Sequence, residues 1–136
     1  MTTWNERNKG VIEEFRANGG KVKGWGPLIL LTTTGAKTGQ PRIAPLMRVD
    51  EGNRLLAVAS KGGAPKHPDW YLNLLAHPEV TVEVGDDKFT TTARILTGEE
   101  RERAFKRAIE VYPNYGKYQQ NTAREIPVIA LERTAK

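Results

Sequence analysis

The sequence predicts a single α+β domain whose mainly antiparallel sheet closes as a small barrel. Its 136 residues are enough for one domain that buries a core without cross-links. Six segments have the period-two or short apolar patterns of strands, and most follow one another instead of alternating with helices. About four peripheral helices complete the prediction. This order of elements is typical of antiparallel α+β folds and small barrels.

The first 20 residues are expected to form an amphipathic helix ahead of one domain that spans residues 21–136. Within residues 3–18, Trp4, Val11, Ile12 and Phe15 recur at helical spacing among charged side chains, and the sequence NGGK ends the pattern. We expect this apolar stripe to pack on the core. Peripheral contact with a membrane is the alternative.

Three strands are expected next, with the sequences LILLTTT, RIAPLMRV and RLLAVAS, joined by the turns GAKTGQP and DEGN. The segment HPDWYLNLLAHP then predicts a short helix. A hairpin made of VTVEVG and KFTTTARIL follows. Thr97 and Glu100 have the spacing of a capping box before a second, charged helix. After a short helical segment with tyrosines, IPVIALER is expected to form the last strand.

Several classes of site are excluded by what the sequence lacks. It contains no cysteine, so disulfides, thiolate metal sites and cysteine nucleophiles are ruled out. No GxSxG, P-loop or GxGxxG motif is present. His67 and His77 each precede a proline and lack the spacing of metal ligands, so no metal site is expected. The start does not have the pattern of a signal peptide, and cytoplasmic location is the default expectation.

Positive charge is concentrated in one part of the sequence. The formal net charge is +5, but residues 20–67 alone carry eight basic residues against Asp50 and Glu51. Two glycine-containing loops carry the residues best suited to binding an anion. Their sequences are TTTGAKTGQPR and SKGGAPKHPDW. Glycines let backbone N–H groups turn towards an anion, while lysine and arginine add charge. Together the two loops predict a phosphate-binding site. A solvated turn is the alternative for the first loop alone.

The segments LLTTTGAKTGQPRIAPL, VASKGGAPKHPDWYLNLLAHPEV and YPNYGKYQ resemble the deazaflavin-dependent nitroreductases of actinobacteria, a group that includes F420H2-dependent quinone reductases. The resemblance runs from about residue 27 to residue 132. It implies a split β-barrel of the flavin-reductase kind that binds coenzyme F420, whose tail carries a phosphodiester and several glutamates. The concentrated positive charge then has a natural anionic partner.

The resemblance also implies which residues contact the coenzyme. The first loop and the strand after it would meet its phosphate end and the approach to its ring, through Ala36, Lys37, Thr38, Arg42, Ile43, Ala44 and Pro45. Val58, Ala59, Ser60 and Lys61 would lie along it, with Ser60 near the reactive ring edge. The helical segment would pack against the deazaflavin through Asp69, Trp70, Tyr71, Leu72 and Asn73.

On the acceptor side, the resemblance implies that Tyr112, Tyr115 and Tyr118 border the substrate, with Tyr115 in direct contact. Tyrosine offers an apolar face and a hydroxyl that can donate to a quinone oxygen. Met47 stands where nitroimidazole-reducing members have an aromatic residue. The implied reaction is hydride transfer to a quinone, with nitroaromatics as a second acceptor class. Ser60 and Tyr115 are the candidate catalytic residues, and the protein is expected to be a monomer or homodimer.

Three other functions remain open on the residues alone. The same fold with flavin mononucleotide (FMN) would give a flavin reductase, but FMN is less anionic and explains the basic residues less well. A protein that binds the deazaflavin without turnover is the second alternative. Nucleic-acid binding is the third and is not favoured, because the basic residues lie in loops instead of on a helix or strand face.

Overall fold

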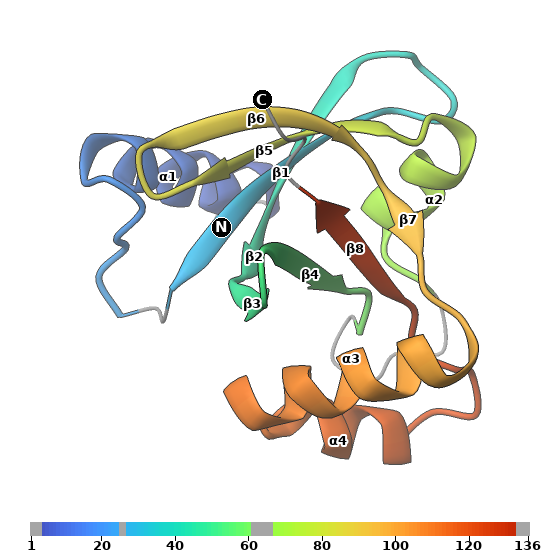
Figure 1. Cartoon of the computed structure of the whole chain (residues 1–136). Helices are drawn as coiled ribbons and strands as arrows, with labels where there is room; N and C mark the ends of the chain where they lie inside the picture. The colour runs from blue at the N-terminus through green and yellow to red at the C-terminus, as the bar shows by residue number, and fades with distance from the viewer. Residues whose placement is uncertain (1–3, 25–26, 61–66, 133–136) are drawn as a thin grey trace.

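The computed structural model describes residues 4–24, 27–60 and 67–132. Its elements, drawn in Figure 1, are α1 (Trp4–Ala17), β1 (Leu28–Thr34), β2 (Pro41–Met47), β3 (Val49–Glu51), β4 (Arg54–Val58), α2 (Asp69–Ala76), β5 (Glu79–Val84), β6 (Asp87–Thr92), β7 (Arg94–Ile95), α3 (Gly98–Val111), α4 (Asn114–Gln120) and β8 (Val128–Glu132). The strands form two four-stranded sheets with the orders β2-β1-β5-β6 and β3-β4-β8-β7.

The α+β class, the antiparallel pairing and the four helices are therefore confirmed, whereas the six strands and the closed barrel are wrong. Two predicted strands each divide at a single residue. Arg48 separates β2 from β3, and Ala93 separates β6 from β7. In both cases the chain leaves one sheet and enters the other. No glycine or proline stands at either bend, so the sequence pattern gave no sign of the division.

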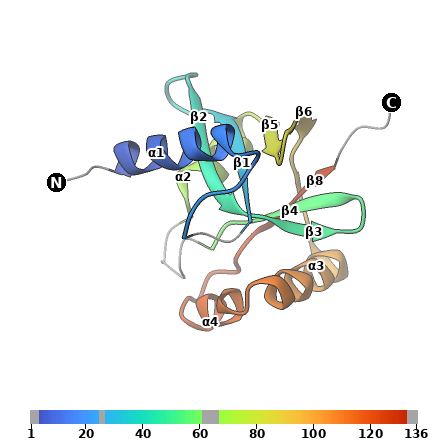
Figure 2. The same ribbon diagram turned by 90° about the vertical axis from the view of Figure 1, so that its left-hand side faces the viewer.

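The elements stack in layers. Figure 2 shows α1 on one side of the sheets and the α3–α4 pair on the other. The main core lies between the two sheets, and smaller apolar clusters lie under α1 and under α3 and α4. The strands β1, β4 and β8 have apolar residues at successive positions because each packs on the main core with one face and on a helix-covered cluster with the other. In β1, Ile29 and Leu31 face the main core, while Leu28 and Leu30 face α1.

The first helix is docked on the sheet, as its apolar stripe predicts. Phe15 of α1 is buried against Leu28 and Leu30 of β1, with Val11 and Ile12 of the helix packed against the same cluster. A two-bond ion pair adds to this contact, because Arg16 Nε and Nη2 donate to the carboxylate of Glu83 on β5 at 3.0 and 2.8 Å. Among the helices of the described residues, none combines the length and apolar character needed to cross a bilayer.

The capping box expected at the start of α3 does not form. Thr97 occupies the N-cap position with extended backbone, but its side chain makes no capping hydrogen bond. Glu100 turns instead to Arg94 and Arg54, at 3.0 and 2.9 Å. In these contacts the Glu100 carboxylate meets two cations, whereas the capping box would offer it one uncharged backbone donor, so the competition with Arg94 and Arg54 decides where Glu100 points.

Candidate functional site

The first glycine loop is a closed turn between β1 and β2. The Gly35 N–H donates to the Gln40 carbonyl at 2.8 Å, and the Gly39 N–H donates to the Gly35 carbonyl at 2.9 Å. Gly39 has a φ of 70°, a conformation that favours glycine. A Cβ on Gly35 would lie 2.6 Å from Thr38 Oγ1, which accepts the Gln40 N–H at 3.2 Å. The loop therefore has one compact shape, with the Thr38 oxygen turned inward and its O–H still able to donate.

Asn73 of α2 fastens this loop to the rest of the fold. Its Oδ1 accepts the Ala36 N–H at 3.0 Å, and its Nδ2 donates to Thr33 Oγ1 at 3.1 Å. Asn73 is 8% exposed and Thr33 1% exposed. The sequence predicted Asn73 as a coenzyme contact. In the structure its amide side chain holds the loop in place.

Lys37 and Arg42 are the two cations of the loop, and both are exposed. Lys37 makes no hydrogen bond or ion pair with any described residue. Among the described residues, the Arg42 side chain donates to the Pro41 carbonyl alone, at 3.4 Å. No described carboxylate therefore neutralises either side chain. An anion that approaches the loop meets two available positive charges on a fixed backbone.

The other residues predicted along the coenzyme occupy different environments. Ile43 packs with the cluster under α1. Ala44 and Pro45, next in β2, are half-buried. At the end of β4, Val58 faces α3 and α4, Ala59 faces the main core, and Ser60 is 8% exposed. Lys61, the remaining residue of this group, lies outside the described residues.

The predicted contacts on α2 do not share one face. Trp70 and Tyr71 pack against the main core, and burial raises the pKa of Tyr71. Asp69 and Leu72 are exposed, whereas Asn73 is buried. Five consecutive helical residues span more than one turn, so they cannot all meet one ligand through their side chains.

The predicted acceptor residues come together in one cluster. Tyr115 is buried in the apolar layer under α3 and α4, and Met47, Tyr112 and Tyr118 pack against that layer. The ring centroids of Tyr112 and Tyr115 are 5.0 Å apart in an edge-to-face arrangement. Val58 of β4 belongs to the same layer. The structure thus places the tyrosines beside the strand predicted to bind the coenzyme.

The tyrosine hydroxyls differ in their electrostatics. The Tyr112 and Tyr118 hydroxyls are 3.4 Å apart, and Asn114 Nδ2 donates to Tyr112 Oη at 3.2 Å. Hydrogen bonds with Tyr118 and from Asn114 lower the pKa of Tyr112, and the bond to Tyr112 raises the pKa of Tyr118. Burial, with the neighbouring tyrosines, raises the pKa of Tyr115 well above its usual value. Tyr115 is therefore a neutral hydroxyl at physiological pH.

Sequence reasoning missed Arg124, which precedes β8. Its Nη2 donates to the Ser60 carbonyl at 2.8 Å, and its Nη1 donates to the Ala59 carbonyl at 3.1 Å. The same Nη1 lies 3.2 Å from His67 Nδ1. His67, read from sequence as loop punctuation, also contacts the Tyr71 ring, with centroids 4.7 Å apart. Nothing in the sequence around Arg124 indicated contacts with residues about 60 positions away.

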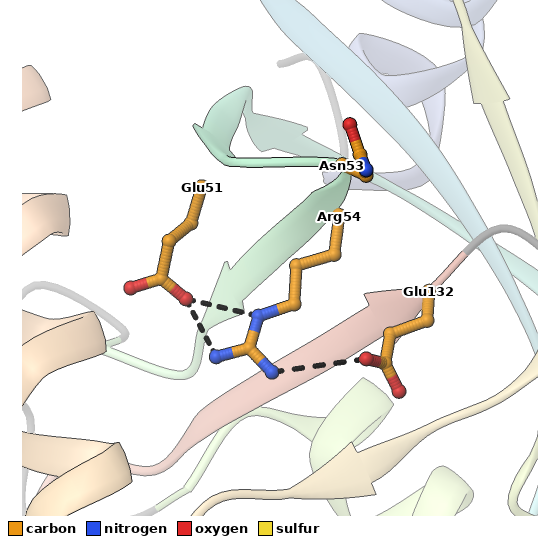
Figure 3. Close-up of a pocket in the computed structure, with 4 residues that line it drawn as sticks. All are labelled: Glu51, Asn53, Arg54 and Glu132. Atoms are coloured by element: carbon orange, nitrogen blue, oxygen red, sulfur yellow. Dashed lines mark hydrogen bonds and ion pairs between the residues drawn. The ribbon is translucent and has the colours of Figure 1, made fainter.

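A small open pocket lies elsewhere, at the β3–β4 hairpin and the end of β8. Its lining residues are Glu51, Asn53, Arg54 and Glu132, none of which the sequence predicted as a site (Figure 3). Arg54 is paired with Glu51 at 2.6 Å and with Glu132 at 3.9 Å. Because its charges satisfy one another, we interpret this pocket as a structural ion-pair network. The described residues contain no cluster of ligands suited to a metal ion.

Comparison with known proteins places these features in a family. The sequence model of the F420H(2)-dependent quinone reductase family matches residues 6–133. A protein named F420H(2)-dependent quinone reductase, from Mycobacterium tuberculosis strain H37Rv, is 42% identical over 146 aligned positions that cover 98% of both chains. A solved structure titled as an F420-H2 dependent reductase is 52% identical, with a TM-score of 0.73, and covers 82% of this chain and 100% of that one.

A second solved structure, described as a domain-swapped dimer, is 48% identical, with a TM-score of 0.76, and covers 95% of this chain and 97% of that one. The family match spans nearly the whole chain, and the identity to the mycobacterial protein extends over almost the full length of both sequences. The loop, strand and tyrosine cluster described above all lie within the matched range. This chain belongs to the F420H2-dependent quinone reductase family.

Proposed function

We propose that this protein is an oxidoreductase that uses reduced coenzyme F420 to reduce a quinone, with nitroaromatics as a second class of acceptor. The observation that carries the proposal is the loop of residues 35–40 with the start of β2, where Lys37 of the loop and Arg42 of the strand have no carboxylate partner among the described residues. Family membership supplies the identity of the anion. The basic loop supplies a place for that anion to bind.

The residues present fit the anionic part of the coenzyme. Lys37 and Arg42 would hold the phosphodiester by charge, and Arg42 can offer a two-bond fork. The Thr38 hydroxyl would add a third donor. Asn73 keeps the loop in one shape before binding, so little order has to be created when the anion arrives. Ala36, Ile43, Ala44 and Pro45 would border the approach to the ring.

At the other end of the site, the β4 residues Val58, Ala59 and Ser60 would lie along the coenzyme ring, together with Lys61. Of Asp69, Trp70, Tyr71 and Leu72 of α2, those that share one face of the helix would border it. When bound, reduced F420 supplies a hydride. The chain's contribution is to stack the two reactants at transfer distance and to exclude water.

Ser60 and Tyr115 are the proposed catalytic residues. A quinone that accepts a hydride develops negative charge on oxygen, and a neutral hydroxyl placed there stabilises it. Tyr115 carries its proton at physiological pH, as tyrosine ordinarily does, and burial raises its pKa further. Tyr112, Tyr118 and Met47 would form the walls of the acceptor site. The product quinol also needs one proton, which solvent or a tyrosine hydroxyl would supply; Tyr112 and Tyr118, whose hydroxyls are 3.4 Å apart, are the candidate tyrosines.

We also infer a split barrel, homodimer formation and a cytoplasmic location. The bends at Arg48 and Ala93, where the chain passes from one sheet to the other, support the split barrel.

The domain-swapped dimer of a 48% identical protein supports a dimer here. Phe15, Val11 and Ile12 of α1 are packed on the fold, so they do not offer lipid a free apolar face. Light scattering after size-exclusion chromatography tests the dimer.

The central experiment titrates the purified protein with F420 and with FMN, then adds menadione to the complex with reduced F420. We expect micromolar binding of F420, weaker binding of FMN and faster oxidation of the coenzyme. Replacing both Lys37 and Arg42 by alanine should weaken F420 binding far more than Lys106→Ala, which removes a charge from the exposed face of α3. No F420 binding would refute the proposal, and binding without faster oxidation would indicate a carrier.

A further inference from the structure

Arg124 joins two stretches of chain that flank the second basic loop. Its guanidinium donates to the carbonyls of Ala59 and Ser60 on one side and contacts His67 Nδ1 on the other, at 3.1, 2.8 and 3.2 Å. A guanidinium has donors only, so His67 Nδ1 must be the acceptor. His67 is therefore neutral in this contact and carries its proton on Nε2.

The segment that carries Arg124 is itself held from α3 and α4. Gln119 Nε2 donates to the Arg124 carbonyl at 2.8 Å, while Gln119 Oε1 accepts the Ile126 N–H at 2.9 Å. Arg101, 4% exposed, donates through Nη2 to Gln119 Oε1 at 3.1 Å and to the Ile126 carbonyl at 2.6 Å. The backbone on both sides of Glu125 is thus held by α3 and α4, and this fixes the position from which the Arg124 side chain contacts the Ser60 carbonyl.

This chain of contacts connects the two halves of the candidate site. Gln119 belongs to α4, the helix that carries Tyr115 and Tyr118, whereas Ser60 follows β4. A displacement of α4 would be transmitted through Gln119 and Arg124 to the Ser60 carbonyl. The described groups seen to face His67 are Arg124 and Tyr71. If His67 were protonated, it would lose its acceptor and place a second cation beside Arg124.

We propose that Arg124 is a positioning residue of the coenzyme site, which holds the Ser60 end of β4 and neutral His67 in one arrangement and ties both to α4. This inference rests on the proposed function. Arg124 acts through the backbone it fixes and through His67. Its role is therefore distinct from that of Lys37 and Arg42, which we assign to direct contact with the phosphate.

The test combines a measurement without coenzyme and one with it. The chain has two histidines, so a His77→Gln background leaves His67 as the only histidine signal in an NMR pH titration. Burial and the adjacent Arg124 cation both lower the pKa of His67, so Arg124→Ala should raise it by removing the second cause. The same change should weaken F420 binding by about tenfold or more, since two charge-assisted hydrogen bonds to the backbone are lost.

Three variants separate positioning from charge. Arg103→Ala removes an exposed arginine whose ion pair with Glu99 measures 3.9 Å, and it should change neither measurement. Arg124→Lys keeps the charge but cannot hold two carbonyls and a ring nitrogen in the same fork, so F420 binding should stay weak. His67→Asn keeps an acceptor near the position of Nδ1 and should bind F420 within about threefold of the wild type. Circular dichroism checks that each variant is folded.

Full recovery of binding in Arg124→Lys would overturn the positioning role and leave only a charge effect. The same conclusion would follow if Arg124→Ala were folded and bound F420 as tightly as Arg103→Ala. If the wild-type chain bound no F420 at all, the proposed function would fail, and the positioning role with it. The two failures are therefore distinguishable in one set of titrations.

Discussion

Asn73 offers a sharp test of how the first loop is held. Asn73→Ala removes the acceptor of the Ala36 N–H and the donor to Thr33 Oγ1, at 3.0 and 3.1 Å. Ala36 is exposed, so water can replace its partner, whereas Thr33 is 1% exposed and keeps only a long bond, 3.5 Å, to the Arg42 carbonyl. One lost bond and one poorly satisfied buried hydroxyl together cost about 2 kcal/mol.

For a chain of this length, such a loss should lower the midpoint of thermal unfolding by about 6 °C. It should also raise the dissociation constant for F420 by about tenfold, because the coenzyme must then order the loop itself. Differential scanning fluorimetry and a fluorescence titration measure the two effects. Asn53→Ala, at an exposed position of the β3–β4 turn, is the matched control and should change neither quantity.

Asn73→Asp distinguishes loop anchoring from electrostatics. The carboxylate can still accept the Ala36 N–H, and the Thr33 hydroxyl can turn to donate to it, so stability should stay close to that of the wild type. Coenzyme binding should nevertheless weaken, because a negative charge now stands behind the loop that carries Lys37. A stable Asn73→Ala variant with unchanged F420 affinity would refute the anchoring argument.

Three further predictions concern the loop, the helix contact and the acceptor site. Gly35→Ala should lower the free energy of unfolding, measured by denaturant titration, by about 1 kcal/mol, because the new Cβ displaces Thr38 from its bond to the Gln40 N–H. Adding Thr38→Ala to the same chain should lower it little further, since that bond is already lost. In Glu83→Gln, the free energy of unfolding should depend less on pH in the acid range. The hydrogen bond from Arg16 lowers the pKa of Glu83, so the ion pair contributes its full stability above the unfolded value of 4.5. This contribution is lost as pH falls below that value. Tyr115→Phe should lower kcat for menadione about tenfold with F420 affinity unchanged, and the reverse pattern would place Tyr115 in the coenzyme site.

The sequence was informative wherever a local pattern decides the outcome. The apolar stripe of α1 and the glycine turn between β1 and β2 both follow from neighbouring residues. The sequence did not predict contacts that depend on residues far away along the chain. Glu100 has the spacing of a capping residue, yet Arg54, 46 positions away, competes for it. Arg124 has no distinguishing pattern in the sequence, and its contact with the Ser60 carbonyl exists only because the fold brings the two residues together.

The structure also shows which of the basic residues in the range 20–67 are paired with carboxylates and which are available to an anion. Arg48 is paired with Asp50 at 3.0 Å, and Arg54 with Glu51 and Glu100 at 2.6 and 2.9 Å. Both acidic residues of the segment are therefore engaged at the β3–β4 hairpin, away from the glycine loop. The paired arginines contribute little to the field that an approaching anion meets, since their charges are compensated locally. Of the remaining cations, Lys21 and Lys23 lie before β1, and Lys61 and Lys66 lie outside the described residues. Lys37 and Arg42 are the two at the glycine loop, whose backbone Asn73 fixes. A site built in this way suits a compact phosphate group better than a long polyanion such as nucleic acid, which needs cations spread along a face.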